Sequence, residues 1–420
     1  MATVADLLPG VGGPTPKTFR LGTHRAVAPE ATAARLARLL PVLGITRIAD
    51  VTGLDAIGIP VVMVCRPNAR SLSVSQGKGL DLAAARASGL MEAAELYHAE
   101  RITLPLKLAS WNELRFTHEL ADVGALSRPA ASAYHDDLRL LWIEGRDLVR
   151  GEPLWVPYET VHLNCTLPLP PASGCFRMTS NGLASGNHFL EALCHGLCEG
   201  IERDAATLWE MGGPAARART RVDLATVDDP ACRSVLDLYD RAGITVAAWE
   251  TTSDVAVPSF RAVILDRDPD PFYAVGASAG MGCHPAREVA LLRALTEAAQ
   301  SRLTSIAGAR DDMARAQYAL SRNPDVVERL RSDLVAGPAA RSFRQAPTWE
   351  SDTFDEDLLW LLDRLAAVGL GQVVAVDLTQ ESLGIPVAKV IVPGLEPLAD
   401  VPGYRPGPRA LAATTAASSS

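Results

Sequence analysis

The stretch "SNGLASGNHFLEALCHGLCEGIERDA", residues 180–205, places a turn rich in Gly and Asn before a helix that carries Glu191, Glu199 and Glu202. Arg203 is the only Lys or Arg in the stretch. At about 100° per residue, the three glutamates share one face of the predicted helix, and leucines occupy the opposite face. Carboxylates without counter-charges indicate either a solvated polar face or a site that binds a cation.

Two further predicted helices repeat this pattern. "SGLMEAAELYHAE" carries Glu92 and Glu95 among Ala, Met and Leu, which would make a poor solvent-facing surface, and "REVALLRALTEAAQSRL" carries Arg293 and Glu297. Carboxylates at positions i and i+3 on facing helices can hold Mg²⁺, which takes oxygen ligands and keeps substrate phosphates as partners. A solvated polar stripe is the alternative. The predicted metal ligands are Glu92, Glu95, Glu199 and Glu202.

A magnesium site raises the question of nucleotide binding. "SVSQGKGLD" is not a P-loop, because Leu80 follows the glycine after Lys78 where Ser or Thr is needed. "GVGGPTPK" near the start is Gly-rich but opens no βαβ unit. ATP would therefore be held by Mg²⁺-bridging carboxylates and by arginines.

Cys194, His195 and Cys198 could suggest zinc. Cys194 and Cys198 lie four residues apart, but His195 points to another face and no second cluster has ligand spacing. Small cysteines that face the core are the favoured interpretation.

Three segments of the chain resemble one another. Each consists of a helix ended by glycine, a strand, a polar turn and a second strand that begins at proline. Glycine just after a helix and proline at the start of a strand are the positions where these residues destabilise the structure least. The matching residues are Gly44, Gly243 and Gly369, and Pro60, Pro258 and Pro386. We therefore predict an α/β protein built from repeated helix–strand–strand units. The alternative is that the three segments resemble one another by chance.

Composition narrows the class of protein. With 420 residues, 48% hydrophobic and 21% charged, the chain fits one large or two ordinary globular domains. A net charge of -9 argues against a nucleic-acid binder. The sequence shows no signal peptide, and its apolar runs fall short of the roughly 18 residues of a membrane span. Seven scattered cysteines without a CxxC pair indicate a reduced, cytoplasmic protein.

Three motifs together resemble the YcaO-domain family: "SGLMEAAELY", "SNGLASGNHFLEALCHGLCEGIERDA" and "RALTEAAQSR". "GITRIADVTGLDAIGIPV" is similar to the TfuA-associated type of that family. The resemblance runs from about Lys17 to Glu396 and implies a YcaO-type α/β fold with carboxylate-bearing helices around an ATP site. It implies a flexible N-terminus at 1–16, a YcaO catalytic domain at 17–398, and a Pro-containing, partly disordered tail at 399–420.

The resemblance also implies an activity: ATP- and Mg²⁺-dependent activation of a peptide backbone amide. A nucleophile adds to the carbonyl, the oxyanion takes the γ-phosphate, and phosphate leaves as a heterocycle, thioamide or amidine forms. Glu199, Glu202 and Arg203 would be catalytic, and the four glutamates named above would bind Mg²⁺ and the phosphate end. Residues implied to bind the nucleotide are Lys17, Ser88, Ser180, Asn187, Glu191, Arg203, Arg293 and Glu297.

Two departures from the family pattern bear on the product. Leu96 follows Glu95 where many members have Arg, and "VPGYRPGPRA" is not a terminal PxPxP of the kind common in azoline-forming members. The favoured reading is thioamide formation on a ribosomally made precursor peptide. A TfuA-like or E1-like protein is the expected partner, since no partner domain is fused, and the family also implies a homodimer. Azoline or amidine formation is the enzymatic alternative, and a non-catalytic nucleotide-binding scaffold is the alternative from another class.

Overall fold

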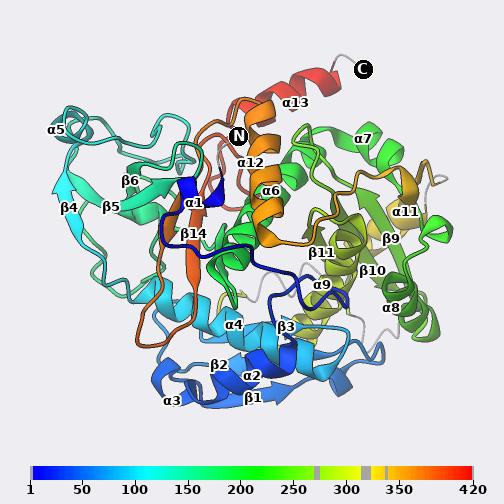
Figure 1. The fold of residues 1–420 in the computed structure, drawn as a ribbon. Helices are drawn as coiled ribbons and strands as arrows, with labels where there is room; N and C mark the ends of the chain where they lie inside the picture. The colour runs from blue at the N-terminus through cyan, green and yellow to red at the C-terminus, as the bar shows by residue number, and fades with distance from the viewer. Residues whose placement is uncertain (1–2, 269–274, 314–322, 336–338, 419–420) are drawn as a thin grey trace.

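The computed structural model describes residues 3–268, 275–313, 323–335 and 339–418. Its centre holds three long helices, α4 (Leu82–Glu100), α6 (Phe189–Met211) and α9 (Arg287–Ala307). Three sheets surround these helices (Figure 1). Each of the three helices packs against a strand that directly precedes it in the chain.

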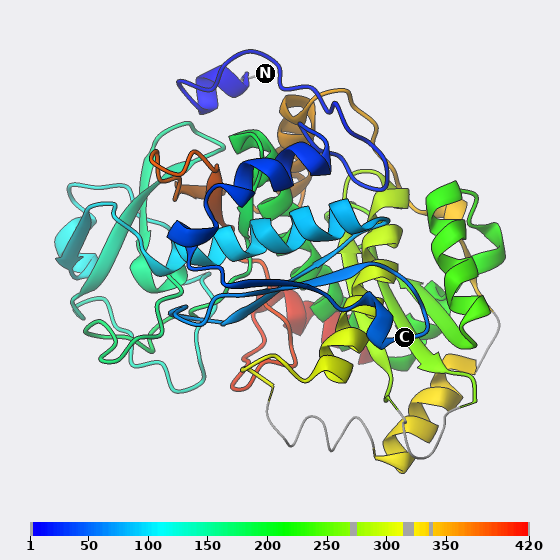
Figure 2. The ribbon, with the colours of Figure 1, turned by 90° about the horizontal axis from the view of Figure 1, so that it is seen from below.

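The first unit ends on α4. Its three strands pair antiparallel in the order β1-β2-β3, and α2 packs beside α4, as Figure 2 shows from below. Its elements are α2 (Pro29–Ala37), α3 (Leu40–Leu43), β1 (Arg47–Asp50), β2 (Val61–Cys65) and β3 (Val74–Lys78).

The second unit ends on α9 and has the same plan. Its strands pair antiparallel in the order β9-β10-β11. Its elements are α8 (Pro230–Arg241), β9 (Ile244–Glu250), β10 (Ser259–Asp266) and β11 (Ser278–Cys283).

The third unit is assembled out of sequence order. Helix α12 (Phe354–Ala367) leads into the antiparallel pair β13 (Val374–Asp377) and β14 (Val387–Ile391), but the next strand is β7 (Leu183–Ser185), from much earlier in the chain. Strand β7 leads directly into α6, as β3 leads into α4. The predicted helix–strand–strand units are therefore present. The glycines that end their helices adopt φ values of +69°, +70° and +81° at Gly44, Gly243 and Gly369.

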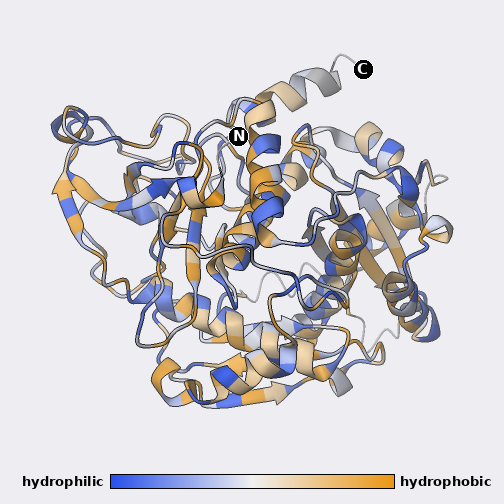
Figure 3. Cartoon of the chain, viewed as in Figure 1, coloured by the Kyte–Doolittle hydropathy of each residue, from blue (hydrophilic) through white to orange (hydrophobic). Residues whose placement is uncertain are grey.

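The third unit is extended into a six-stranded sheet in the order β4-β5-β13-β14-β7, with β6 paired to β5. Hydrophobic residues concentrate along the strands in Figure 3. The remaining elements are α1 (Val4–Leu7), η1 (Thr52–Leu54), β4 (Leu106–Ala109), α5 (Trp111–Leu114), β5 (Leu140–Asp147), β6 (Pro153–Pro157), η2 (Tyr158–Thr160), α7 (Gly213–Thr220), β8 (Val222–Asp223), η3 (Leu224–Thr226), α11 (Pro324–Val335), β12 (Arg341–Ser342), η4 (Phe343–Gln345) and α13 (Pro408–Ser418).

Both ends of the chain contain helix where looser structure is predicted. Val4 and Leu7 of α1 are buried, and α13 buries Ala410. In the 310–352 region α11 is present, while 314–322 and 336–338 lie outside the described residues. The described helices include none long and apolar enough to cross a membrane.

Glycines let each central helix lie directly on its strand. A Cβ added at Gly77 of β3 would come within 2.1 Å of the Ala85 carbonyl oxygen of α4, and one at Gly282 of β11 within 2.1 Å of the Ala290 carbonyl oxygen of α9. Larger residues at these glycines would push the helix away. This close contact brings the carboxylates of the helices next to the strand backbones.

Candidate functional site

Helix α4 contributes two carboxylates, each of which hydrogen-bonds to a strand. Glu92 Oε2 accepts from the backbone N–H of Gln76 in β3, at 3.0 Å, and Glu95 Oε1 accepts from the N–H and hydroxyl of Ser185 in β7, at 2.9 and 2.7 Å. Burial raises the pKa of both carboxyls, that of Glu95 to about 8, although the hydrogen bonds oppose the shift. The two groups therefore resist ionisation when no cation is bound.

Helix α6 contributes Glu199 and Glu202. Arg203 lies 3.7 Å from a Glu199 oxygen and 3.4 Å from a Glu202 oxygen. Arg203, the one cation of this stretch, is therefore the counter-charge that α6 supplies for two carboxylates. Burial still raises the pKa of Glu202 to about 7, against the attraction of Arg203, and the negative charge of Glu297 adds to the rise.

Helix α9 contributes Glu297 and Arg293. Glu297 Oε2 lies 2.7 Å from Lys78 Nζ of β3, and its other oxygen accepts from the N–H of Met281. Burial raises the pKa of Glu297, but Lys78 and Arg203 outweigh it and the net shift is downward. Arg293 Nη2 lies 3.0 Å from His195 Nε2 on α6.

These contacts join the three helices into one site. The charge of Glu199 raises the pKa of both α4 carboxyls, and the charge of Glu297 raises that of both α6 carboxyls. The contacts agree: β3 meets Glu92 of α4 through the Gln76 N–H and Glu297 of α9 through Lys78, and Arg293 of α9 lies beside His195 of α6. We call the group the carboxylate cluster; its members are Glu92, Glu95, Glu199, Glu202 and Glu297.

The donor set of the cluster fits magnesium with a polyphosphate. Among the described residues, no group of three or more His, Cys, Asp or Glu side chains is arranged to hold a metal ion alone. Mg²⁺ is usually bound by one or two carboxylates and completed by phosphate oxygens and water. The Nε atoms of Arg203 and Arg293 are buried and have no hydrogen-bond partner among the described residues, which leaves donors for an anion. The four predicted metal ligands thus lie together, and their role stays a prediction.

Glu191 and Asn187 lie at the start of α6, beside the N-terminal segment. Glu191 accepts from Arg25 at 3.3 Å, from the Ala26 N–H at 3.0 Å and from the Asn187 N–H at 3.2 Å. The Asn187 side chain accepts from the hydroxyl of Thr32. Glu191, His195 and Arg293 line a small cavity of about 30 Å³, together with His24 and His284 among others. Two of the predicted nucleotide residues, Glu191 of α6 and Arg293 of α9, therefore border one cavity.

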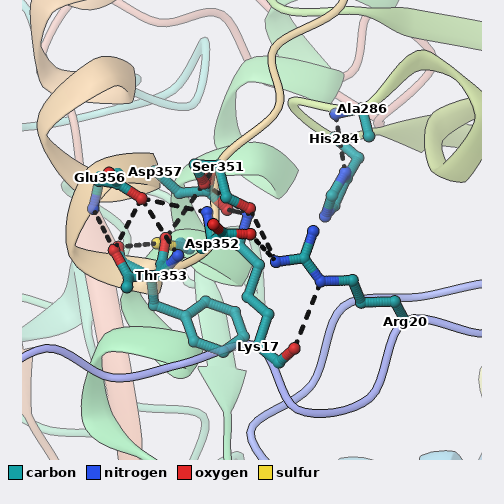
Figure 4. Close-up of polar contacts among 11 residues, drawn as sticks. Lys17, Arg20, His284, Ala286, Ser351, Asp352, Thr353, Glu356 and Asp357 are labelled. Atoms are coloured by element: carbon teal, nitrogen blue, oxygen red, sulfur yellow. Dashed lines mark hydrogen bonds and ion pairs between the residues drawn. The ribbon is translucent and has the colours of Figure 1, made fainter.

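Lys17, which is predicted to bind the nucleotide, is engaged in an ion pair in this structure. Its Nζ lies 2.6 Å from Asp357 of α12 and 2.7 Å from the hydroxyl of Ser351, and its side chain is fully buried (Figure 4). A second ion pair, between Arg20 Nη2 and Asp352 Oδ1 at 2.8 Å, joins the N-terminal segment to the residues just before α12. In this structure Lys17 joins the N-terminal segment to α12.

The other predicted residues are placed more simply. Ser88 lies half-buried in α4, one turn before Glu92, and Ser180 lies exposed in the loop before β7. Cys194 and Cys198 are buried, and the Cys194 thiol donates to the Phe354 carbonyl, which agrees with core cysteines.

Sequence reasoning missed two lysines at the site. Lys78 lies in a stretch that does not match the P-loop pattern, yet its side chain pairs with Glu297. Lys389 is buried in β14, near enough to Glu199 for each charge to shift the pKa of the other. A lone lysine inside the apolar run "IPVAKVIVP" is a signal that could have identified it, since lysine is seldom fully buried.

The comparisons agree with this architecture. A protein of Rhizobium leguminosarum bv. trifolii, described as an uncharacterized protein in the tfuA 3′ region, is 38% identical over 384 residues, covering 89% of this chain and 88% of its own. The structure of YcaO from Methanopyrus kandleri, bound with AMPPCP and Mg²⁺, superposes with a TM-score of 0.73 at 23% identity, over 94% of this chain and 99% of that one. A heterocyclase solved in complex with substrate and cofactor gives a TM-score of 0.75 at 22% identity, over 93% of this chain and 55% of that one.

At these identities the two structural likenesses describe the fold alone. The family model described as YcaO cyclodehydratase, ATP- and Mg²⁺-binding, matches residues 76–396, which include the carboxylate cluster and all three central helices. The chain therefore belongs to the YcaO family.

Proposed function

We propose that this chain uses ATP and Mg²⁺ to activate a backbone amide of a ribosomally made peptide, and that the product is a thioamide. The observation that carries the proposal is the carboxylate cluster, which gathers five glutamates from three helices around a few cations; Glu202 is buried and the other four are partly buried. Such an arrangement binds a polyphosphate with magnesium better than it binds an organic substrate.

The carboxylates and the arginines of the site have different proposed roles in phosphoryl transfer. Oxygens of Glu92, Glu95, Glu199 and Glu202 would hold Mg²⁺. When bound, MgATP supplies the phosphoryl group that turns the amide oxygen into a leaving group. Arg203 and Arg293 offer unpartnered N–H groups to negative charge that develops on phosphate oxygens. Such transfer depends on positioning and charge neutralisation and needs no protein nucleophile.

The tfuA context supports the thioamide product. The relative of 38% identity comes from the tfuA 3′ region, and it covers most of both chains. A TfuA-like protein is therefore the proposed partner. In this reaction hydrosulfide adds to the amide carbon, and the resulting oxyanion takes the γ-phosphoryl group of ATP with release of ADP. The C–O bond then breaks to release phosphate as the sulfur loses its proton, which leaves a C=S bond.

Azoline formation is the second candidate, because the family is described as a cyclodehydratase family. The two products differ in mass. Replacing an amide oxygen by sulfur adds about 16 Da, whereas cyclodehydration removes about 18 Da. The test incubates the enzyme with ATP, Mg²⁺, a sulfide source, a TfuA-like protein and the precursor peptide encoded nearby, and weighs the peptide.

The expected product is heavier by the sulfur-for-oxygen difference and requires sulfide. The control uses the Glu199→Gln variant, which should leave the peptide unmodified. A product that has lost water, and whose formation depends on a Cys, Ser or Thr of the precursor, would reject the thioamide proposal in favour of the azoline.

A further inference from the structure

Lys389 is an unusual residue of the central sheet. It lies in the middle of β14, paired with Val376 on one side and Leu183 on the other, and only 1% of it is exposed. Among the described residues it forms no ion pair with a carboxylate; its Nζ donates to the carbonyls of Thr179 and Asn181 instead. Burying an ammonium without an ion pair is costly, so a lysine kept here needs a reason.

The two carbonyls belong to the loop that begins the glutamate-rich motif. Thr179 and Asn181 flank Ser180, and the Asn181 carbonyl lies 2.8 Å from Nζ. The loop also packs closely against β14, the strand that carries Lys389. A Cβ on Gly182 would come within 2.2 Å of the Val390 carbonyl oxygen. Lys389 therefore fixes the backbone on both sides of Ser180.

The same loop contacts the elements that carry the carboxylate cluster. The Val390 N–H donates to the Gly182 carbonyl, and a Cβ on Gly196 of α6 would come within 2.8 Å of that carbonyl oxygen. Strand β7, which follows the loop, carries Ser185, whose N–H and hydroxyl donate to Glu95 of the cluster. A displaced loop would therefore disturb both α6 and the group that holds Glu95.

We propose that Lys389 is a positioning residue of the ATP site, whose side-chain amine donates to the carbonyls on both sides of Ser180 and so holds the loop against α6 and β7. The inference rests on the proposed ATP- and Mg²⁺-dependent function. Its two effects can be measured separately: Lys389 orders the loop before β7, and it strengthens binding of Mg²⁺ by the cluster.

The test compares Lys389→Met with Lys389→Gln. Methionine has a similar length and no charge, whereas the glutamine amide can still donate to one carbonyl. Lys107→Met is the matched control, because Lys107 lies in β4 of the same sheet and contacts the ring of Trp155. Three readouts are taken: hydrogen exchange of residues 179–185, the Mg²⁺ concentration that half-saturates ATP hydrolysis, and the KM for ATP.

Lys389→Met is expected to raise the half-saturating Mg²⁺ concentration by tenfold or more and to speed amide exchange at Leu183, whose N–H donates to the Ser180 carbonyl. Lys389→Gln, which keeps one donor, should show a smaller rise in both quantities. Lys107→Met should change neither. Wild-type exchange together with wild-type Mg²⁺ dependence in Lys389→Met would overturn the positioning role.

Two outcomes separate this inference from the proposed function. If the wild-type protein neither binds nor hydrolyses ATP, the proposed function fails, while exchange at 179–185 still reports on the loop. If Lys389→Met does not fold, Lys389→Gln decides. Wild-type exchange together with wild-type Mg²⁺ dependence in that variant would show that the buried lysine does not position the site.

Discussion

Replacing Glu95 by glutamine should stabilise the nucleotide-free protein at alkaline pH. Burial raises the pKa of this carboxyl from 4.5 to about 8. A carboxyl with a raised pKa contributes full stability below its unfolded pKa, and that contribution is lost as the pH rises through the folded value. The wild-type protein should therefore lose stability between about pH 5 and pH 8, and Glu95→Gln should lose less.

The size of the expected stabilisation follows from the raised pKa of Glu95. Each pKa unit corresponds to about 1.4 kcal/mol, so a rise to about 8 costs about 5 kcal/mol when the group is fully ionised. Glu95 is only partly shielded from solvent and its neighbours relax, so we expect about half of this value or less. The glutamine oxygen can still accept from Ser185, which keeps the loss of hydrogen bonding small. The expected net stabilisation is about 2 kcal/mol at pH 8.

The assay is urea denaturation of the nucleotide-free protein at pH 6, 7 and 8, with Glu100→Gln as the matched control on the same helix. Burial raises the pKa of Glu100, but hydrogen bonds from Arg66 and Ser71 outweigh it and the net pKa is lowered. Loss of that charge leaves Arg66 buried and unpaired, so Glu100→Gln should destabilise by about 3 kcal/mol. A Glu95→Gln variant that is less stable than wild type at pH 8 would refute the reasoning.

The remaining predictions concern the metal, the nucleotide and the N-terminal segment. Glu199→Gln and Glu202→Gln should each abolish ATP turnover while keeping a wild-type circular dichroism spectrum; near-normal hydrolysis by both would reject their metal role. EDTA should weaken ATP binding by tenfold or more in calorimetry, about 1.4 kcal/mol, and equal affinity with and without Mg²⁺ would count against the cluster. Lys17→Met should lower the free energy of unfolding by about 3 kcal/mol, because it leaves Asp357 buried without its partner; a melting temperature equal to wild type would contradict this.

Features with local causes were predictable from the sequence. The glycines that end the three unit-leading helices were identified because a left-handed residue after a helix favours glycine. The pairing of glutamates three residues apart also placed four members of the carboxylate cluster correctly on their helices. Both features depend on chain geometry over a few residues, which the sequence displays directly.

Features with distant partners were not predictable in the same way. Lys17 meets Asp357, Glu297 meets Lys78, and the sequence contains no local sign of either pair. Such contacts are fixed by packing of segments that are far apart in the chain.

The order in which the strands appear has a consequence for how the site forms during synthesis. Leu183 of β7 pairs with Lys389 of β14, and α6 packs on the same strand, so the glutamates of α6 lack their supporting sheet until nearly the whole chain has been made. The first two units, by contrast, pair only strands that are neighbours in sequence. Long-range pairing of this kind slows folding and prolongs exposure of apolar surface. A ribosome-bound chain that ends before β14 should therefore hold two folded units and an α6 that still lacks its supporting sheet.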